Sequence, residues 1–387
     1  MIGRKKNILC ISVMQSWGGG EEFLLKLAAN IKEYKFVIAS PEGEPVKTFE
    51  QNGIEAIRIN SLKKFYRRNN AWGITSGIKI LFNITISTIR VIKVILTSKI
   101  DLILANGNFA GMYGVPVKIL TRKKFIIVQH LIHKEESFEA KILKMLYRYS
   151  DKLVSISDSV SENLQLILGD DFKKKTTKIR HGIILPELDE SYADKKENIS
   201  IGIVGSIIRL KAIDNIFEAA KESIYQNKNV HIHIFGAPRE DEPDSVIYEK
   251  ELMKFIVDAN LERNVHFHGF EKSKEKIYSS IDILINYSSI PESFSLTVLE
   301  ALLFGKIVIA SDVGGPRELI TNNKNGFLVP PSNTKALSEK IKYCIGKFNS
   351  IEIEAVRNNA RKSVEENFSL ERFSSEYKRL FDSILYA

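Results

Sequence analysis

The chain has 387 residues, of which 44% are hydrophobic, and it carries a net charge of +9. A chain of this length is expected to form two domains. It contains only two cysteines, Cys10 and Cys344, far apart in the sequence. This argues against a secreted, disulfide-stabilised protein and favours a reducing compartment such as the cytoplasm.

Positive charge is concentrated in the first half. Residues 1–190 carry a net charge of +11 and residues 191–387 one of −2, and the segment 61–100 contains bases but no acid. This distribution predicts an anionic partner, namely phospholipid, a lipid-linked phosphate or nucleic acid, and the alternative is a solvated lysine-rich face. The most apolar long window, 78–96, is interrupted by three bases, so we expect a poor membrane span.

Short apolar, β-branched runs alternate with helical patterns along the whole chain. The runs that predict strands in the first half are 7–13, 35–40, 101–105, 124–129 and 152–156. Those in the second half are 199–205, 230–236, 264–269, 282–287 and 306–311. Runs that are apolar throughout are typical of strands buried on both faces of a parallel sheet covered by helices.

A polar segment without periodicity, 186–200, separates the two sets of strands and is the predicted linker. The sequence therefore predicts an α/β protein of two doubly wound, Rossmann-like domains, with a first boundary near residue 190. Ligands of such folds bind at the carboxyl ends of the strands, so we expect two facing domains with the site in a cleft between them.

The first predicted strand is followed by a glycine loop that contains Gly18, Gly19 and Gly20 and opens a helix near Glu21. Three glycines allow a ligand to approach the backbone closely, and amides at a helix N-terminus suit an anion. The loop has neither the dinucleotide pattern nor the Walker pattern. The alternative is a tight turn without a ligand.

Charged residues stand at two predicted helix starts in the second half. Arg209 and Lys211 follow the strand 199–205, where two cations would hold a diphosphate; solvent-facing charges are the alternative. Glu292 precedes a helix that carries Glu300 two turns along. A carboxylate beside free amides suits sugar hydroxyls, and the second carboxylate suits a ribose; an acid that merely favours the helix dipole is the alternative.

His130 ends the strand 124–129 and is a candidate donor to a substrate hydroxyl, whereas His133 is a weaker candidate in the same loop. Both could equally be loop histidines with solvent partners. Neither lies in a zinc-binding frame, so no metal site is predicted. Four further histidines alternate on two strands that we expect to be central, which predicts packing: His231, His233, His266 and His268.

Taken in order, these segments resemble the retaining glycosyltransferases of family 4, such as glycogen synthase and phosphatidylinositol mannosyltransferase, which have the GT-B fold. The segments that carry the resemblance include "GGGEEFLLKLA", "VQH", "GIVGSIIRLKAIDNIFEAA", "PESFSLTVLEAL" and "GKIVIASDVGGPRELI". It implies an acceptor-binding domain over 1–190, a nucleotide-sugar-binding domain over 191–367, and a last helix in 368–387 that crosses back to the first domain.

The resemblance also implies roles for individual positions. The catalytic residues would be His130 and Glu292. The donor sugar would be held by Glu292, Ser293, Phe294 and Ser295. The nucleotide would be bound by Glu300, Phe270 and Leu296. The donor diphosphate would be bound by Lys211, Arg209, Ser206, Gly18, Gly19 and Gly20. Two positions depart from the family pattern, because Ser206 stands where Arg is usual and His181 where Asn is common.

The implied reaction is sugar transfer from a nucleotide-diphosphate donor, preferably a UDP-sugar, to a glycan or lipid-linked acceptor, with retention and without a metal or other cofactor. Retention without a covalent nucleophile implies front-face attack, unlike the two-carboxylate glycosidases. The bases within residues 63–68 are expected to bring the enzyme to an anionic membrane as a peripheral protein on its cytoplasmic face, and nucleic acid is not an expected partner.

Three other functions are compatible with parts of this pattern. A nucleotide-sugar epimerase of the same fold would release nucleotide without an acceptor. A phosphorylase would need a pyridoxal lysine and a much longer chain. A non-catalytic basic protein that binds membrane or nucleic acid would keep its function after Glu292 is changed.

Overall fold

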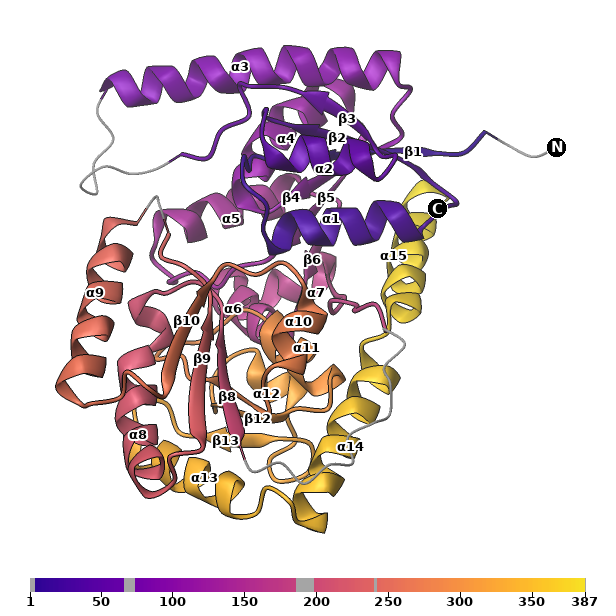
Figure 1. The fold of residues 1–387 in the computed structure, drawn as a ribbon. Coiled ribbons are helices and arrows are strands. Elements are labelled where there is room, and N and C mark those ends of the chain that lie inside the picture. The colour runs from indigo at the N-terminus through magenta and orange to yellow at the C-terminus, as the bar shows by residue number, and fades with distance from the viewer. Residues whose placement is uncertain (1–3, 66–73, 186–197, 240–241, 387) are drawn as a thin grey trace. The chain divides into compact units, whose positions relative to one another are not determined.

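The computed structural model consists of two compact units (Figure 1). Its described residues are 4–65, 74–185, 198–239 and 242–386. Unit 1 comprises Met1–Gly182 and Leu370–Ala387, and unit 2 comprises Ile183–Ser369. The expected boundary at residue 190, and most of the expected linker, lie outside the described residues.

Unit 1 is built around a parallel sheet of seven strands among its described residues, in the order β3-β2-β1-β4-β5-β6-β7. The strands are β1 (Asn7–Ile11), β2 (Lys35–Ser40), β3 (Glu55–Arg58), β4 (Leu102–Asn106), β5 (Lys124–Gln129), β6 (Lys152–Ser155) and β7 (Thr176–Lys178). The helices are α1 (Gly19–Asn30), α2 (Glu44–Gln51), α3 (Ile74–Thr97), α4 (Asn108–Thr121), α5 (Phe138–Tyr149), α6 (Asp158–Leu168), the 3₁₀ turn η1 (Gly169–Asp171), α7 (Phe172–Lys175) and α15 (Leu370–Leu385).

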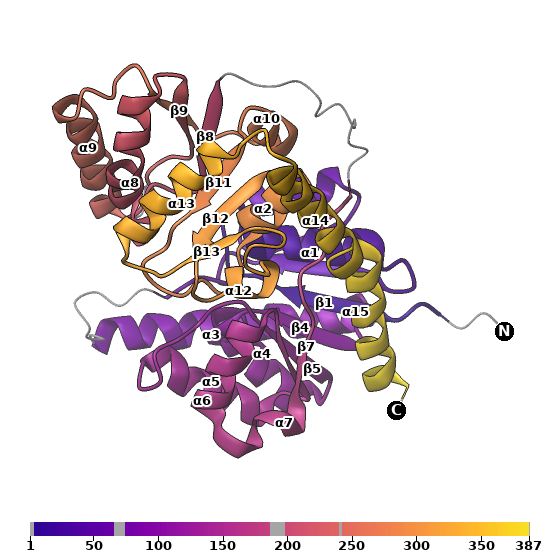
Figure 2. The same ribbon diagram turned by 90° about the horizontal axis from the view of Figure 1, so that it is seen from below.

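Unit 2 repeats this plan with a parallel sheet of six strands among its described residues, in the order β10-β9-β8-β11-β12-β13 (Figure 2). The strands are β8 (Ile199–Val204), β9 (Val230–Phe235), β10 (Val265–Gly269), β11 (Ile283–Asn286), β12 (Ile307–Ser311) and β13 (Phe327–Val329). The helices are the 3₁₀ turn η2 (Arg209–Lys211), α8 (Ile213–Gln226), α9 (Pro243–Asp258), α10 (Lys274–Ser279), α11 (Leu296–Leu303), α12 (Pro316–Leu319), α13 (Thr334–Gly346) and α14 (Ile351–Asn367).

The central strands are apolar because helices cover both of their faces. In unit 2, one face packs against α8, α9 and α13 through residues such as Ile201 and Ile232. The other face packs against α11 and α14 through residues such as Leu284 and Val308. Two hydrophobic layers around one parallel sheet define a doubly wound domain. The predicted α/β class and the two Rossmann-like domains are confirmed.

All ten predicted strands are present, each within two residues of its predicted ends. Three strands were not predicted: β3, β7 and β13. They have only three or four residues each, and β3 and β7 contain mostly polar or charged side chains, "EAIR" and "TTK". Such strands occur near the edges of a sheet, where burial on both faces is not required.

The placement of His266 and His268 on a central strand is wrong, whereas His231 and His233 lie on β9, which is paired on both sides. Within the described part of the chain, β10 is an edge strand of unit 2 and pairs with β9 alone. The histidines form cross-strand pairs there, with His231 Nδ1 3.2 Å from His266 Nε2 and His233 Nδ1 2.9 Å from His268 Nε2. These rings are stacked and partly exposed, so they do not form part of the core. The order of the strands in the sheet determines whether a strand is central or at an edge, and this order could not be read from the sequence.

The helix α15 belongs to unit 1, although it follows unit 2 in the chain. Its apolar side chains recur every three or four residues and are buried. The Phe373 ring lies 5.8 Å from that of Phe23 on α1, and Phe381 lies 5.4 Å from Tyr34. The chain therefore leaves unit 1 after Gly182 and returns to it at Leu370.

Candidate functional site

The strand order in unit 2 determines where a ligand would bind. Numbering runs outward in both directions from β8 and β11, so the crevice between the carboxyl ends of these two strands is the topological switch point. The loop after β8 begins at Gly205, whose φ is 127°, a conformation that favours glycine. A Cβ atom at Gly236 would lie 1.9 Å from the Gly205 carbonyl oxygen. The loops after β8 and β9 can therefore pack together only with glycine at position 236.

Lys211 and Glu292 meet at this crevice. Lys211 lies in η2 after β8, Glu292 lies in the loop after β11, and their Nζ and Oε1 atoms are 2.5 Å apart. Both side chains are about one-fifth exposed. Ser288 Oγ also donates to Glu292. Burial alone would raise the pKa of Glu292, but the Lys211 ammonium and the hydrogen bonds outweigh it and lower that pKa. The carboxylate is therefore anionic at neutral pH.

A glycine pair holds the Glu292 loop in place. Gly314 forms a parallel bridge with Glu292, and the Gly315 N–H donates to the Glu292 carbonyl at 2.8 Å. A Cβ atom at Gly314 would lie 2.5 Å from the Glu292 carbonyl oxygen, and one at Gly315 would lie 2.7 Å from Phe294 Cα. Two backbones in such close contact require glycine at both positions, which accounts for "VGGP" following β12.

The N-terminus of α11 lies next to Glu292. Ser295 is its N-cap residue, but its hydroxyl does not cap the helix. Instead, Asn286 Nδ2 at the end of β11 donates to Ser295 Oγ and to Thr297 Oγ1, both at 3.2 Å. Asn286 Oδ1 is buried and has no hydrogen-bond partner among the described residues. The positive end of the α11 dipole thus favours an anion at the same crevice.

Glu300 lies further along α11 and is 8% exposed. Its carboxylate accepts a hydrogen bond from the Tyr278 hydroxyl at 2.8 Å and pairs with Lys274 Nζ at 2.6 Å. Phe270 follows β10 and is 74% exposed. Leu296, the first residue of α11, is partly exposed.

Arg209 and Ser206 share the loop after β8 with Lys211. Arg209 does not join the Lys211–Glu292 pair. Its guanidinium makes two hydrogen bonds to Glu251, at 2.8 and 2.9 Å, and one to Asp244 at 3.0 Å, so it is directed to α9. Ser206 is partly buried directly after Gly205.

Unit 1 has its own switch point, between β1 and β4. Gly18 is the N-cap of α1 and, like Gly19 and Gly20, lies at the carboxyl edge of this sheet. Asn106 at the end of β4 connects this loop to His130, because its Nδ2 donates to the Gly20 carbonyl at 3.0 Å and its Oδ1 lies 2.6 Å from His130 Nε2. Burial lowers the pKa of His130 to about 4. The ring is therefore neutral at pH 7 and donates its Nε2 proton to Asn106.

His133 and His181 have different surroundings. The amide nitrogens of Asn108 and Gln129 lie 3.0 and 2.8 Å from His133 Nε2, which is therefore an acceptor. His181 stacks against His130 at 6.0 Å, and burial lowers its pKa to about 3. Among the described residues, no group of three or more His, Cys, Asp or Glu side chains is arranged to hold a metal ion.

Several residues of these two crevices were not predicted: Asn106, Asn286, Ser288, Tyr278 and Lys274. Asn106 and Asn286 share a sequence signal, because each ends an apolar run that begins after an aspartate, in "DLILAN" and "DILIN". A polar amide in the last position of a buried strand lies at the ligand-binding edge. Tyr278 and Lys274 come from α10, and only the folded chain brings them to Glu300.

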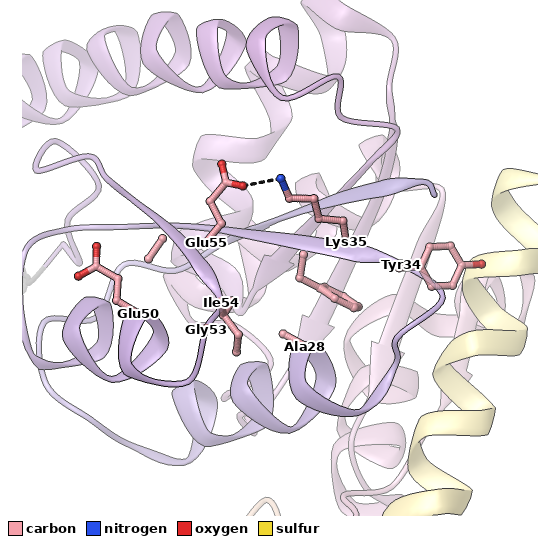
Figure 3. A pocket seen from close by; sticks show the side chains of 9 residues that line it. Ala28, Tyr34, Lys35, Glu50, Gly53, Ile54 and Glu55 are labelled. Carbon is pink, nitrogen blue, oxygen red and sulfur yellow. Dashed lines mark ion pairs between the residues drawn. The ribbon is translucent and has the colours of Figure 1, made fainter. Parts of the chain in front are cut away.

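A depression elsewhere in unit 1 lies between α1, α2, β2 and β3 (Figure 3). Lys35 and Glu55, the first residues of β2 and β3, form an ion pair of 2.7 Å there. The depression is therefore at the amino-terminal edge of the sheet, opposite to the edge at which such folds bind ligands.

Residues 186–363 match the model of the family described as glycosyl transferases group 1. This region includes all the residues of the unit 2 crevice described in this section. The match covers most of unit 2, and it shows which family this part of the chain resembles.

The chain is similar to the poly(ribitol-phosphate) alpha-N-acetylglucosaminyltransferase of Staphylococcus aureus, with 27% identity over 184 residues that cover 47% of this chain and 35% of the relative. It is also similar to an uncharacterized glycosyltransferase of Methanocaldococcus jannaschii, with 25% identity over 284 residues, 68% of this chain and 69% of the relative. The chain therefore spans about a third of the first relative and about two thirds of the second.

The fold is similar to that of HepE from Anabaena, whose crystal structure contains UDP and glucose. The TM-score is 0.79 with 21% identity, and the match covers 97% of this chain and 99% of the other. This likeness confirms the predicted GT-B fold with two Rossmann-like domains.

Proposed function

We propose, from the group 1 match and the geometry of unit 2, that the protein is a retaining glycosyltransferase of family 4. It would transfer a hexosyl group from a nucleotide-diphosphate donor, a UDP-sugar, to a glycan or lipid-linked acceptor in surface polysaccharide assembly. The observation that carries this proposal is the Lys211–Glu292 pair, held on the Gly314–Gly315 backbone beside the α11 N-terminus.

Lys211 and Glu292 would exchange partners when the donor binds. The donor diphosphate is a stronger anion than one carboxylate, so Lys211 turns from Glu292 to the diphosphate in a charge-assisted contact. Glu292, released from Lys211, accepts hydrogen bonds from the sugar hydroxyls. The amides at the start of α11, including those of Phe294 and Ser295, stabilise the negative charge of the leaving diphosphate.

Glu300 would hold the ribose. A carboxylate has about four lone-pair sites, and Tyr278 and Lys274 occupy two of them in the structure. The others accept from the paired ribose hydroxyls, while Phe270 packs against the base. Arg209 would reach the diphosphate only by breaking its bonds to Asp244 and Glu251.

The residues of unit 1 would act on the transferred sugar. His130 is neutral at pH 7 and carries an Nε2 proton that it donates to Asn106, and it can redirect that proton to a sugar hydroxyl. Gly18, Gly19 and Gly20 provide backbone amides at the same edge. Glu292 acts as a sugar holder and not as a nucleophile, so retention proceeds by front-face attack through an oxocarbenium-like state.

The proposal includes independence from metal ions, because Lys211 and the helix N-termini neutralise the diphosphate. The names of the similar proteins support a UDP-linked donor and a phosphate-rich glycan acceptor. An anionic acceptor or membrane also suits the positive charge of residues 1–190. We place the enzyme in the cytoplasm, at the cytoplasmic face of the membrane.

The test is a thermal-shift and hydrolysis screen against UDP-, GDP- and ADP-sugars, with and without a chelator. A ligand at 100 times its dissociation constant stabilises the folded state by about 2.7 kcal/mol. We expect one UDP-sugar to stabilise the protein, chelator to have no effect, and Lys211→Ala and Glu300→Ala to lose the stabilisation. Lys254→Ala, an exposed lysine on α9, is the matched control.

Two outcomes would contradict the proposal. Stabilisation by no nucleotide sugar would leave the GT-B fold without the transferase activity. Release of free nucleotide and a 2-epimerised sugar without any acceptor would indicate the epimerase. The anomeric configuration of the product, measured by NMR, tests retention separately.

A further inference from the structure

The helix α3 exposes an apolar face. Five large hydrophobic side chains on it are between 63% and 72% exposed: Ile78, Leu81, Phe82, Ile89 and Leu96. Four of them, at positions 78, 82, 89 and 96, recur at spacings of four or seven and therefore lie on one side of the helix. The opposite side, with Val91 and Ile95, is buried. In Figure 1, α3 runs along the outer edge of unit 1.

This helix does not cross a membrane. The segment Gly77–Thr97 is long and apolar enough to span, and 28% of its most apolar window is buried. However, α3 connects β3 to β4, and both strands belong to the same sheet. A spanning helix would place these two strands on opposite sides of the bilayer, which the parallel sheet forbids. The apolar face can therefore only lie along a surface.

Positive charge lies beside the apolar face. Lys79, Arg90 and Lys93 are exposed on α3, and none of them forms a salt bridge within the described part of the chain. From residue 56 to residue 100 the sequence contains no acid. Lys63, also exposed, precedes the helix; Tyr66, Arg67 and Arg68, expected to bind a membrane, lie outside the described residues.

We propose that α3 is a membrane-docking helix that lies in the plane of an anionic bilayer. Ile78, Phe82, Ile89 and Leu96 enter the boundary between headgroups and acyl chains, and the three bases contact the lipid phosphates. An apolar stripe flanked by Lys and Arg is the pattern of an interfacial helix. A second copy of the chain is a poorer occupant, because it would bring the same unpaired bases together. The inference concerns unit 1 and does not depend on transferase activity.

The experiment is flotation of the full-length protein with vesicles of phosphatidylcholine alone or of phosphatidylcholine with an equal part of phosphatidylglycerol. We expect binding to the anionic vesicles only. Removal of one base should weaken it about fivefold, the effect of about 1 kcal/mol, so that the triple variant Lys79→Gln, Arg90→Gln, Lys93→Gln binds about a hundredfold more weakly. The matched charge control is Lys250→Gln with Lys254→Gln on α9.

The apolar contribution is tested with Phe82→Asp and Ile89→Asp together. Both side chains are exposed, so the variant should fold, and we expect at least a tenfold loss of vesicle binding. The control is Ile247→Asp with Val257→Asp, two similarly exposed apolar residues of α9. Stabilisation by the UDP-sugar should be unchanged in all these variants, which separates this inference from the proposed function.

Several results would overturn the proposal. One is equal flotation of the α3 variants and the wild type, and another is no flotation of the wild type with anionic vesicles. A third is a concentration-dependent dimer in sedimentation experiments that the Phe82→Asp, Ile89→Asp variant abolishes, since it would show that a second copy covers this face.

Discussion

The two units share one construction at the amino-terminal edges of their sheets. In unit 1, Asp101 precedes β4 and its carboxylate accepts the N–H of Asn7 at 2.9 Å. In unit 2, Asp282 precedes β11 and accepts the N–H of Ser200 at the same distance. The strand that follows each aspartate ends in an asparagine, which is Asn106 in β4 and Asn286 in β11. The same aspartate-to-backbone hydrogen bond therefore joins the two central strands in each unit, β1 to β4 and β8 to β11.

The carboxyl-terminal edges differ in charge. In unit 2, the asparagine supports an α11 N-terminus beside the Lys211–Glu292 ion pair. In unit 1, it joins the glycine loop to the neutral His130. Topology thus determines where a ligand can bind, and the residues after each strand determine which chemistry it meets. The variants below test this difference, from the largest expected effect to the smallest.

Gly315→Ala should have the largest effect. The new Cβ atom would lie 2.7 Å from Phe294 Cα and 3.0 Å from the Ser295 nitrogen, and neither backbone atom can move without moving the Glu292 loop. A displacement of about 1 Å can cost about a hundredfold in rate, so we expect about that loss of turnover. The measurement is the initial rate of the proposed sugar transfer.

Gly346→Ala is the control, because a Cβ atom there meets nothing within 4 Å. It lies in the same unit and carries the same chemical change. Equal rates for Gly315→Ala and Gly346→Ala would show that the Glu292 loop is not held by the glycine pair.

Low pH should reduce the free energy of unfolding, because the buried neutral histidines of unit 1 become protonated when the chain unfolds. The folded-state pKa values of His130 and His181, about 4 and about 3, lie below the unfolded value of about 6.5. Their contribution to stability is therefore complete above pH 6.5 and is lost as the pH falls through 5 toward 4. At pH 5 the cost is on the order of 2 kcal/mol per histidine, about thirtyfold in the folding equilibrium.

The measurement is urea denaturation at pH 7 and pH 5, compared within each variant. His181→Asn should lose less stability between these two pH values than the wild type, whatever its stability at pH 7. Val257→Ala, which changes an exposed apolar residue of unit 2, should behave like the wild type. An identical pH dependence of His181→Asn and the wild type would disprove the role of the buried pair.

Arg209→Ala should have the smallest effect on donor binding. Its guanidinium is held by Glu251 and Asp244, and exposed ion pairs contribute little, so we expect a change in donor affinity within about fivefold. Lys211→Ala, two residues away, should lower the rate by about a hundredfold. Both variants are compared by their donor affinity and by their rate of transfer. If Arg209→Ala lost as much of each as Lys211→Ala, Arg209 would have to leave α9 and bind the diphosphate, as its sequence position suggested.

The sequence was sufficient to predict the fold, because strands buried on both faces leave long apolar runs. It failed at the edges, where β3 and β7 are short and polar, and where His266 and His268 lie on an edge strand. At the site, the proximity of Lys211 and Glu292, 81 positions apart, follows from strand order, which the loop motifs suggested but could not establish. The contact of Arg209 with α9 could not be predicted, because no motif states which carboxylates a long side chain meets.

The return of α15 to unit 1 has a consequence for how the chain folds during synthesis. Phe23 and Tyr34 are made before unit 2, but their partners Phe373 and Phe381 are made after it. Unit 2 is one continuous segment, Ile183–Ser369, and can close its core before unit 1 does. Unit 1 is therefore completed only after unit 2 has been made, and the Phe23 ring on α1 lacks its partner on α15 until then.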